Sequence, residues 1–273
     1  MNRSATPTIL RRMPELTIPA SIPRAALVTG AAHRIGRALA LELGRLGFAI
    51  AVHCRDSRAQ ADAVASEIAR AGGRAVVLQA DLADEAETQG LVAQASAALG
   101  PVGVVVNNAS VFDRDEALTA TRESWTAHLE TNLRAPFVLA QNFARQLAGD
   151  RHGVIVNLVD QRVWNLTPHF VSYTVSKAGL WTLTQTLALA LAPRIRVNAI
   201  GPGPVLPSPR QTDEQFARQV ESVPLRRAPS LDEIAGALRF ILTTPSFTGQ
   251  MVALDSGQHL NWGAPTSAPP HDE

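Results

Sequence analysis

Tyr173 and Lys177 are the residues whose types and spacing point most directly to chemistry. Tyr173 is the single tyrosine of the chain, and its four-residue separation from Lys177 places both side chains on one face of a helix. A phenol with its ordinary pKa of about 10 exchanges protons poorly at neutral pH unless a nearby cation stabilises the phenolate. Lys177 would supply that cation, which makes the pair a candidate for proton transfer. A Tyr-x-x-x-Lys pattern alone is also typical of a structural helix whose lysine reaches into water.

Asp160 lies thirteen residues before Tyr173 and is the second candidate for proton chemistry. Beside a phenolate its carboxylate would meet charge repulsion, so it must be protonated or bonded to donors. Near a substrate it would accept a hydrogen bond from an amino group or relay a proton to a ring nitrogen. The alternative is a site in which this carboxylate has abolished catalysis.

A glycine-bearing turn follows the first apolar segment. Its sequence, Thr-Gly-Ala-Ala-His-Arg-Ile-Gly, places Gly30 at a tight turn and Gly36 where a helix must pack closely. The start of such a helix binds phosphate through its free backbone N–H groups and the helix dipole. We therefore expect the turn, which includes His33, Arg34 and Ile35, to hold the pyrophosphate of a dinucleotide. Buried helix starts also use glycine for packing alone.

Charged residues follow the next apolar segments, where a dinucleotide would continue. Arg55, helped by Arg34, favours the 2′-phosphate of NADPH, although the adjacent Asp56 favours the ribose hydroxyl of NAD. Asp81, followed by Leu82, would accept from an adenine amino group. The alternatives are solvated charges, a helix cap and turn chemistry. Asn108, Ala109 and Ser110 form a third set of candidate cofactor-binding residues. The small side chain of Ala109 would leave room for the cofactor beside the backbone.

Short apolar segments alternate with longer helical patterns along residues 24–263. Segments that are apolar on both faces indicate buried parallel strands, and the intervening patterns are long enough for crossover helices. The pattern predicts an α/β fold, namely a single-domain, doubly wound, seven-stranded parallel sheet of Rossmann type with helices on both faces and ligand at the carboxyl ends of the strands. Strands are expected at Ala25–Thr29, Phe48–His53, Ala75–Gln79, Val102–Asn107, Val154–Leu158, Ile195–Ile200 and Met251–Leu254, and helices at Arg34–Leu46, Ser57–Ala71, Asp84–Leu99, Arg122–Leu147, Ser172–Leu191 and Leu231–Leu242.

Composition limits the class of protein. Hydrophobic residues make up 46% of the 273 positions and charged residues 18%, which is a globular balance. The formal net charge is +1 and no basic run occurs, so nucleic acid is not expected as a partner. Cys54 is the single cysteine and the seven histidines lack His-x-x-x-His spacing, so neither a disulfide nor a metal site is expected.

The two ends of the chain differ from its centre. We expect residues 1–23 to form a flexible N-terminal extension and residues 264–273, rich in Pro, Ser and Ala, to form a flexible tail. No apolar stretch is long enough for a signal-peptide core or for a bilayer span. The sequence therefore predicts a cytoplasmic protein without membrane contact.

Several of these motifs occur together in a fixed order. The Thr-Gly turn, Asn-Asn-Ala, Asn132, Tyr173 with Lys177, and Gly-Pro-Gly at 201–203 closely resemble the short-chain dehydrogenase/reductase family. The resemblance implies a nicotinamide oxidoreductase that is commonly a homotetramer. It implies catalytic roles for Asn132, Tyr173 and Lys177, and cofactor contacts at Pro202 and Gly203. The family's usual serine is absent because Asp160 stands at its position.

A second departure concerns the turn, where Arg34 replaces the usual middle glycine. Together with Asp160 it resembles the pteridine reductases and the related dihydromonapterin and dihydrofolate reductases of this family. In that branch a pterin ring stacks between the nicotinamide and an aromatic side chain, a position that corresponds to Phe112. The substrate-contacting set implied by this resemblance is Arg34, Ser110, Phe112, Asp160 and Tyr173.

The resemblance also implies a mechanism. Hydride from NADPH would reduce a C=N bond of a dihydropterin, and Tyr173 with Asp160 would deliver a proton to the neighbouring nitrogen. Lys177 would hold the nicotinamide ribose, and Asn132 would fix a water or a backbone group near it. Arg34 would touch both the cofactor phosphate and the substrate.

Two other functions agree with the same residues. Reduction of a carbonyl, such as a 3-oxoacyl thioester or a sugar ketone, would use Tyr173 as the acid, but an ionised Asp160 would repel the carbonyl oxygen. A regulatory or scaffold protein would bind nucleotide without turnover. In the pterin-reducing mechanism the Pro-rich stretch at 201–209 would shape the rim of the site, and the polar segment Asp213–Val220 is a candidate lid.

Overall fold

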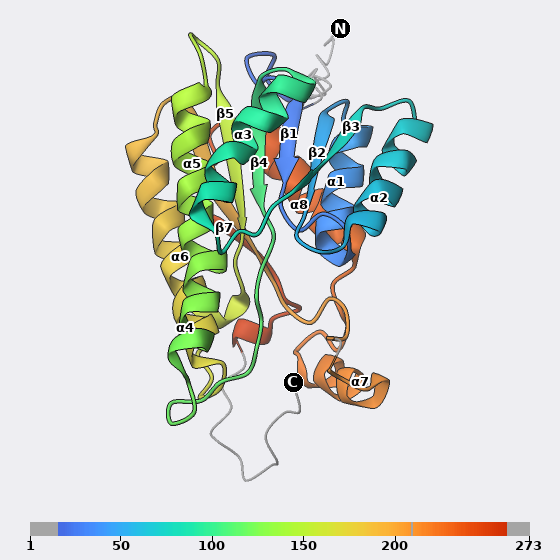
Figure 1. The fold of residues 1–273 in the computed structure, drawn as a ribbon. Helices are drawn as coiled ribbons and strands as arrows, with labels where there is room; N and C mark the ends of the chain where they lie inside the picture. Colours follow the sequence, from blue (N-terminus) through green and yellow to red (C-terminus); the bar gives the residue numbers. More distant parts are fainter. Residues whose placement is uncertain (1–15, 209, 261–273) are drawn as a thin grey trace, which may run out of the picture.

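The protein folds around a seven-stranded parallel sheet (Figure 1). This computed structural model describes residues 16–208 and 210–260. The sheet has the order β3-β2-β1-β4-β5-β6-β7, and the reversal between β1 and β4 is the topological switch point at which doubly wound sheets bind ligands. The predicted fold class is confirmed. The strands are β1 (Ala25–Val28), β2 (Ala49–Cys54), β3 (Ala75–Gln79), β4 (Val102–Asn107), β5 (Gly153–Leu158), β6 (Ile195–Pro202) and β7 (Met251–Leu254).

Helices cover both faces of the sheet and so bury the central strands on two sides, whereas the edge strands β3 and β7 are partly exposed. One face carries α1 (Arg34–Arg45), α2 (Arg58–Arg70) and α8 (Leu231–Thr243), and the other carries α3 (Glu85–Leu99), α5 (Ala135–Gln146) and α6 (Val171–Ala190). Successive strand residues point to opposite faces. In β1, the Val28 side chain therefore packs in the core under α1, α2 and α8, and the Leu27 side chain packs in the core under α3, α5 and α6. This arrangement explains the lack of polar alternation in the strand sequences.

The single helix predicted at Arg122–Leu147 is interrupted in the structure. A π-helical turn, η1 (Glu130–Arg134), separates α4 (Arg122–Leu129) from α5. Such turns are frequent at functional sites, and η1 contains Asn132. The polypeptide remains helical across the turn, so the sequence periodicity does not reveal it.

Another helix, α7 (Asp213–Ser222), lies apart from the two layers, beyond the carboxyl edge of the sheet (Figure 1). It begins with a capping box in which Thr212 and Gln215 exchange side-chain to backbone hydrogen bonds. None of its residues is buried. The segment that the sequence analysis treats as a polar lid is therefore a helix without a core of its own.

The packed domain begins earlier than residue 24. Ile22 is only 2% exposed, and the carbonyl of Ser21 accepts a hydrogen bond from the backbone of His152 (3.0 Å). Ile18 also packs against the core. The C-terminal part of the predicted extension thus belongs to the domain because its apolar side chains are buried there. The rest of that prediction, residues 1–15, and the predicted tail at 264–273 lie outside the described residues.

Within residues 16–208 and 210–260, no helix has the length and apolar character that a membrane crossing requires. The same part of the chain contains no group of three or more His, Cys, Asp or Glu side chains arranged to hold a metal ion.

The turn before α1 provides a test of the packing that builds the site. A Cβ on Gly36 would lie 2.2 Å from the carbonyl oxygen of Gly30 and 2.4 Å from Nδ2 of Asn108, whereas a Cβ on Gly236 in α8 would meet nothing within 4 Å. We expect Gly36→Ala to lower the free energy of unfolding by about 1–3 kcal/mol. The control, Gly236→Ala, should raise it by about 0.5–1 kcal/mol. Urea unfolding measures both, and equal effects of the two substitutions would contradict the assigned packing.

Candidate active site

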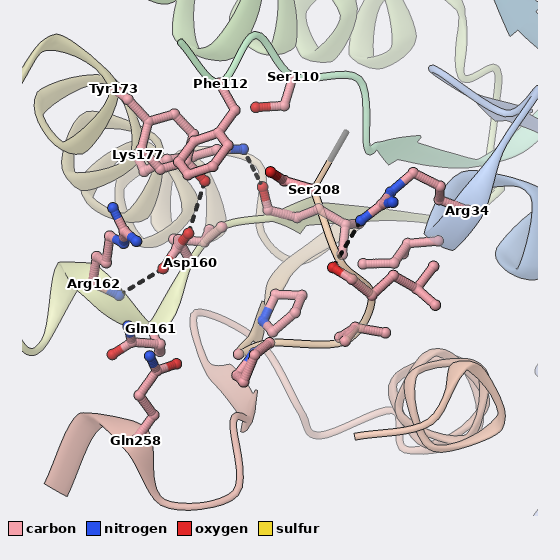
Figure 2. Close-up of a pocket in the computed structure, with 18 of the residues that line it drawn as sticks. Arg34, Ser110, Phe112, Asp160, Gln161, Arg162, Tyr173, Lys177, Ser208 and Gln258 are labelled. Atoms are coloured by element: carbon pink, nitrogen blue, oxygen red, sulfur yellow. Dashed lines mark hydrogen bonds between the residues drawn. The ribbon is translucent and has the colours of Figure 1, made fainter. Parts of the chain in front are cut away.

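Tyr173 and Lys177 lie on the first two turns of α6, and both side chains are buried. The Tyr173 hydroxyl donates to Oδ2 of Asp160 (2.8 Å), while Nζ of Lys177 donates to the carbonyl of Leu158 (2.8 Å) at the end of β5. Nζ of Lys177 lies 5.7 Å from the centroid of the Tyr173 ring. Figure 2 shows the three side chains converging at one cavity. The structure therefore brings these predicted residues together.

A short 3₁₀ turn, η2 (Gln161–Val163), orients the Asp160 carboxylate. Asp160 is the N-cap of this turn, and its Oδ1 accepts from the backbone N–H of Arg162 (2.8 Å). A capping carboxylate satisfies a backbone donor that has no partner within the turn. The cap leaves Oδ2 directed at Tyr173, so one residue performs both tasks (Figure 2).

The proton between Tyr173 and Asp160 belongs to the phenol. Burial raises the pKa of Tyr173 well above 10, the charge and hydrogen bond of Asp160 raise it further, and only the Arg162 cation opposes them. The sequence analysis expects Lys177 to stabilise a phenolate, but in the structure its ammonium donates to Leu158. Tyr173 in the cofactor-free protein is therefore a neutral hydrogen-bond donor.

Asn132 connects η1 to the loop after β4. Its side chain accepts from the backbone N–H of Val111 (2.8 Å) and donates to the carbonyl of the same residue (2.9 Å). It also donates to Oγ of Ser176 (3.0 Å), one residue before Lys177. Of the two roles expected for Asn132, holding a water or a backbone group, the structure shows the second.

Phe112 places an aromatic ring beside the phenol. Its ring stacks on Phe170 with centroids 4.5 Å apart and planes 6° from parallel, and it meets Tyr173 edge-on at 4.6 Å. The guanidinium carbons of Arg162 and Arg210 lie 5.5 and 5.8 Å from the Phe112 centroid. Phe170 is absent from the predicted site. It is the N-cap of α6 and has a left-handed backbone conformation (φ 58°), which no sequence motif predicts.

The reacting groups face a cavity of about 460 Å³. Its far wall is formed by the Pro-rich segment after β6, by Gln219 of α7 and by Gln258 of the short turn η3 (Gln258–Leu260). Pro202 and Gly203, predicted as cofactor residues, line this cavity. The predicted residues among its lining are Arg34, Ile35, Asn108, Ser110, Phe112, Asp160, Tyr173, Lys177, Pro202 and Gly203.

A second cavity, of about 650 Å³, opens at the start of α1. The first turn of α1 has no acidic residue and its N-cap, His33, makes no side-chain cap. Its N–H groups and dipole can therefore receive an anion, which fits the phosphates of a dinucleotide. The two cavities share five lining residues and so adjoin. The predicted cofactor residues around the second cavity are Gly30, His33, Arg34, Ile35, Gly36, Arg55, Asp81, Leu82, Asn108, Ala109 and Ser110.

His53, which the sequence analysis misses, supports the glycine turn from the end of β2. Its Nδ1 accepts from the backbone N–H of Gly30 (3.1 Å), so Nε2 carries the proton that faces the carbonyl of Ala80 (3.1 Å). Burial lowers the pKa of His53 to about 4, which keeps the ring neutral. Gly30 itself has φ +60°, and a Cβ there would lie 2.9 Å from Cα of Ala109.

Arg34 lies where the two cavities meet. Its φ of 51° is left-handed, a conformation that costs a non-glycine residue about 1–2 kcal/mol, which explains the usual glycine at this position. Its guanidinium donates to the carbonyls of Pro207 (2.7 Å) and Leu206 (3.1 Å) rather than to a surface carboxylate (Figure 2). Arg34 therefore links the glycine turn to the Pro-rich segment.

The remaining cofactor candidates make local contacts. Arg55 is exposed and pairs with the neighbouring Asp56 (2.6 Å) at the edge of the second cavity. Oδ1 of Asp81 accepts from the backbone of Ala83 (2.9 Å), which is a turn contact, while the N-cap of α3 is Asp84. Asn108 donates through Nδ2 to the carbonyls of Thr29 (2.9 Å) and Gly30 (3.0 Å), so its side chain holds the glycine turn.

The fold, the glycine turn at the switch point and the Tyr-Lys pair of α6 together define a dinucleotide-binding oxidoreductase of the short-chain type. The profile of the short chain dehydrogenase family matches residues 24–217. This chain belongs to the short chain dehydrogenase family, as its motif order predicts.

Among solved structures, FolM alternative dihydrofolate reductase 1 from Brucella canis, complexed with NADP, is 48% identical with a TM-score of 0.87, covering 92% of this chain and 100% of that chain. A blue fluorescent protein from a metagenomic library, in complex with NADPH, is 31% identical with a TM-score of 0.81, covering 86% and 98%. Among curated proteins, the 3-oxoacyl-[acyl-carrier-protein] reductase FabG of Staphylococcus epidermidis is 31% identical over 242 residues, which are 87% of this chain and 99% of that protein.

The buried Lys177 makes stability depend on pH. Burial lowers its pKa from 10.5 to about 8, although the charge of Asp160 acts in the opposite direction. Between those pH values the unfolded chain binds the proton more tightly, so the contribution of Lys177 to stability rises with pH across that window. We expect the unfolding free energy of Lys177→Met minus that of the wild type to fall by up to about 3 kcal/mol from pH 8 to pH 10.5. Urea unfolding at fixed protein concentration measures this difference. A difference that stays constant between pH 8 and pH 10.5 would show that burial does not lower the pKa of Lys177.

Proposed function

We propose that this chain is an NADPH-dependent reductase that transfers hydride to a C=N bond of a pterin-type substrate. The observation that carries the proposal is the hydrogen bond from buried Tyr173 to Asp160 beside the ring of Phe112. An ionised carboxylate accepts hydrogen bonds and cannot donate one, so it suits the N–H groups of a pterin better than a ketone oxygen. A flat heterocycle also fits against an aromatic ring.

The chain's own residues would handle the proton. Bound NADPH supplies a hydride to the ring carbon, and the electron pair of the C=N bond moves to nitrogen, which takes one proton. Tyr173 and Asp160 relay that proton from solvent, directly or through a water. Because the pKa of Tyr173 is raised, the phenol keeps its proton at neutral pH and donates it in the hydrogen bond to Asp160. Lys177 orients the nicotinamide ribose, while Asn132 keeps the backbone of Val111 in place.

NADPH is proposed rather than NADH. Arg55 and Arg34 supply cations at the second cavity, where a 2′-phosphate would lie. The FolM and blue fluorescent relatives, complexed with NADP and NADPH, support this preference. The 48% identity to a protein named as a dihydrofolate reductase supports the pterin class, since folates contain a pterin ring. A cytoplasmic homotetramer remains the prediction from the family resemblance.

Carbonyl reduction is the second candidate. It is favoured by the FabG relative, whose name gives a 3-oxoacyl substrate, and which is 31% identical to this chain. The position of Asp160 opposes it, because a carboxylate that accepts the hydrogen bond of the Tyr173 hydroxyl has no proton of its own to donate to a carbonyl oxygen.

The proposed function is tested by NADPH oxidation with dihydromonapterin or dihydrobiopterin, compared with a 3-oxoacyl thioester. We expect the wild type to turn over the pterin, and Asp160→Asn to lower kcat/KM by about 100-fold because the proton route loses its carboxylate. If the wild type turns over only the thioester, and Asp160→Ser retains that activity, the function is carbonyl reduction and the pterin assignment is wrong. NADPH binding without turnover of either would indicate a non-catalytic protein.

The cofactor preference has its own test. Loss of a charged hydrogen bond to the 2′-phosphate should make Arg55→Ala bind NADPH about tenfold more weakly and leave NADH binding unchanged. Arg58→Ala is the matched control, since Arg58 pairs with Asp62 on α2 and does not line the cavity. Fluorescence titration gives the dissociation constants. An equal loss of NADPH and NADH affinity in Arg55→Ala would rule out 2′-phosphate recognition by this residue.

A further inference from the structure

Three buried polar side chains, Asp115, His128 and Ser172, touch one another behind the active site, and we call them the Asp115 cluster. They come from the loop after β4, from α4 and from α6. Asp115 is 4% exposed, and His128 and Ser172 are fully buried. None of them belongs to the site predicted from the sequence.

The hydrogen bonds of the cluster run in one direction. The backbone N–H of Asp113 donates to Nε2 of His128 (3.1 Å), which leaves the ring proton on Nδ1. The Nδ1 proton therefore faces two acceptors, Oγ of Ser172 (2.7 Å) and the carbonyl of Ser124 (2.9 Å), and Ser172 donates its own proton to Oδ2 of Asp115 (2.5 Å).

The three residue types are those of a hydrolytic triad, but the arrangement is different. A nucleophilic serine gives its proton to the histidine and faces substrate. Ser172 gives its proton to Asp115, accepts from His128 and is fully buried. The cluster is therefore a positioning device rather than a second catalytic centre.

Asp115 caps the start of α6 from a distant part of the chain. Its carboxylate accepts from the backbone of Ser172 (3.1 Å), and its carbonyl accepts from the backbone of Phe170 (2.8 Å). The helix has no side-chain cap of its own at Phe170. A carboxylate at a helix start is also favoured by the dipole. The residue after Ser172 is Tyr173, so this cap fixes the helix end that bears the phenol.

The same cluster anchors the segment that carries Phe112. The backbone N–H of Val111 donates to Asn132, and that of Asp113 donates to His128. Two residues further on, the Asp115 carboxylate accepts from Ser172. Phe112 lies between Val111 and Asp113, whose backbone N–H groups are held by Asn132 and His128, and it lines both cavities.

We propose that the Asp115 cluster sets the position of the Phe112 ring relative to the Tyr173 phenol and thereby tunes how a flat substrate is held for proton transfer. The substrate part of this inference rests on the proposed function. The two rings, whose centroids are 4.6 Å apart, are attached to the two segments that the cluster joins. Ser172 is the link, because it bonds to both other members.

The test is Ser172→Ala, which removes the link with little change in volume. We expect kcat/KM for the substrate that the wild type reduces to fall about tenfold or more, with a rise in KM, because the ring and the phenol are no longer held together. The dissociation constant of NADPH should change less than kcat/KM does, because the segment held by the cluster forms only one part of the second cavity. His128→Gln, which keeps an acceptor for the Asp113 N–H, should retain more activity than His128→Leu.

Thr184→Ala is the matched control. Thr184 is also fully buried on α6 and hydrogen-bonded, to Asn157 (2.8 Å), but it lies three turns from Ser172. We expect it to lower the melting temperature as Ser172→Ala does and to leave kcat/KM nearly unchanged. If both variants lose stability and neither loses kcat/KM, the cluster has only a structural role and the proposal is overturned.

Hydrogen exchange separates this proposal from the proposed function. In Ser172→Ala, and not in Thr184→Ala, the amides of Asp113 and Phe170 should both exchange faster, because each donates to a member of the cluster. This readout needs no turnover. If the wild type does not reduce a pterin but both amides of Ser172→Ala exchange faster, the pterin assignment is wrong and the positioning role of the Asp115 cluster stands. If exchange at either amide is unchanged in Ser172→Ala, the positioning role of the Asp115 cluster is overturned even if the wild type reduces a pterin.

Discussion

The hydrogen bond between the Tyr173 phenol and the Asp160 carboxylate is the constraint on which the rest of the site depends. A partly buried carboxylate and a buried phenol keep one hydrogen bond only if neither is free to turn away. Asp160 is fixed by the backbone N–H of Arg162, and Tyr173 is fixed by α6. Burial, together with the charge and hydrogen bond of Asp160, raises the pKa of the phenol, so the phenol keeps its proton. The ring of the neighbouring Phe112 meets this phenol edge-on, with centroids 4.6 Å apart.

The sheet supplies the frame for this arrangement. The loops after β1, β4, β5 and β6 meet at its carboxyl edge and bring the two cavities together at Arg34 and Ser110. Arg34 accepts an unfavourable backbone conformation there and bonds to the Pro-rich segment. The glycine turn and the segment before α7 are therefore connected by one side chain.

Much of the fold and of the site could be predicted from the sequence, for reasons visible in particular residues. The strands are apolar on both faces, so their pattern indicates a buried parallel sheet, and the Tyr173–Lys177 spacing places the pair on one helix. The π-turn at Asn132 escaped prediction because helical periodicity continues across it. Phe170, His53 and the Asp115 cluster were missed because their partners are distant in sequence and no local motif marks a buried hydrogen bond.

A double-mutant cycle on Tyr173 and Asp160 tests the central claim most directly. kcat/KM with NADPH and a dihydropterin would be measured for the wild type, Tyr173→Phe, Asp160→Asn and the double variant. If the two residues relay one proton as a unit, the double variant should be no slower than the slower single variant by more than about twofold. Losses that multiply, so that the double variant falls by the product of the two single effects, would show independent roles and contradict the account.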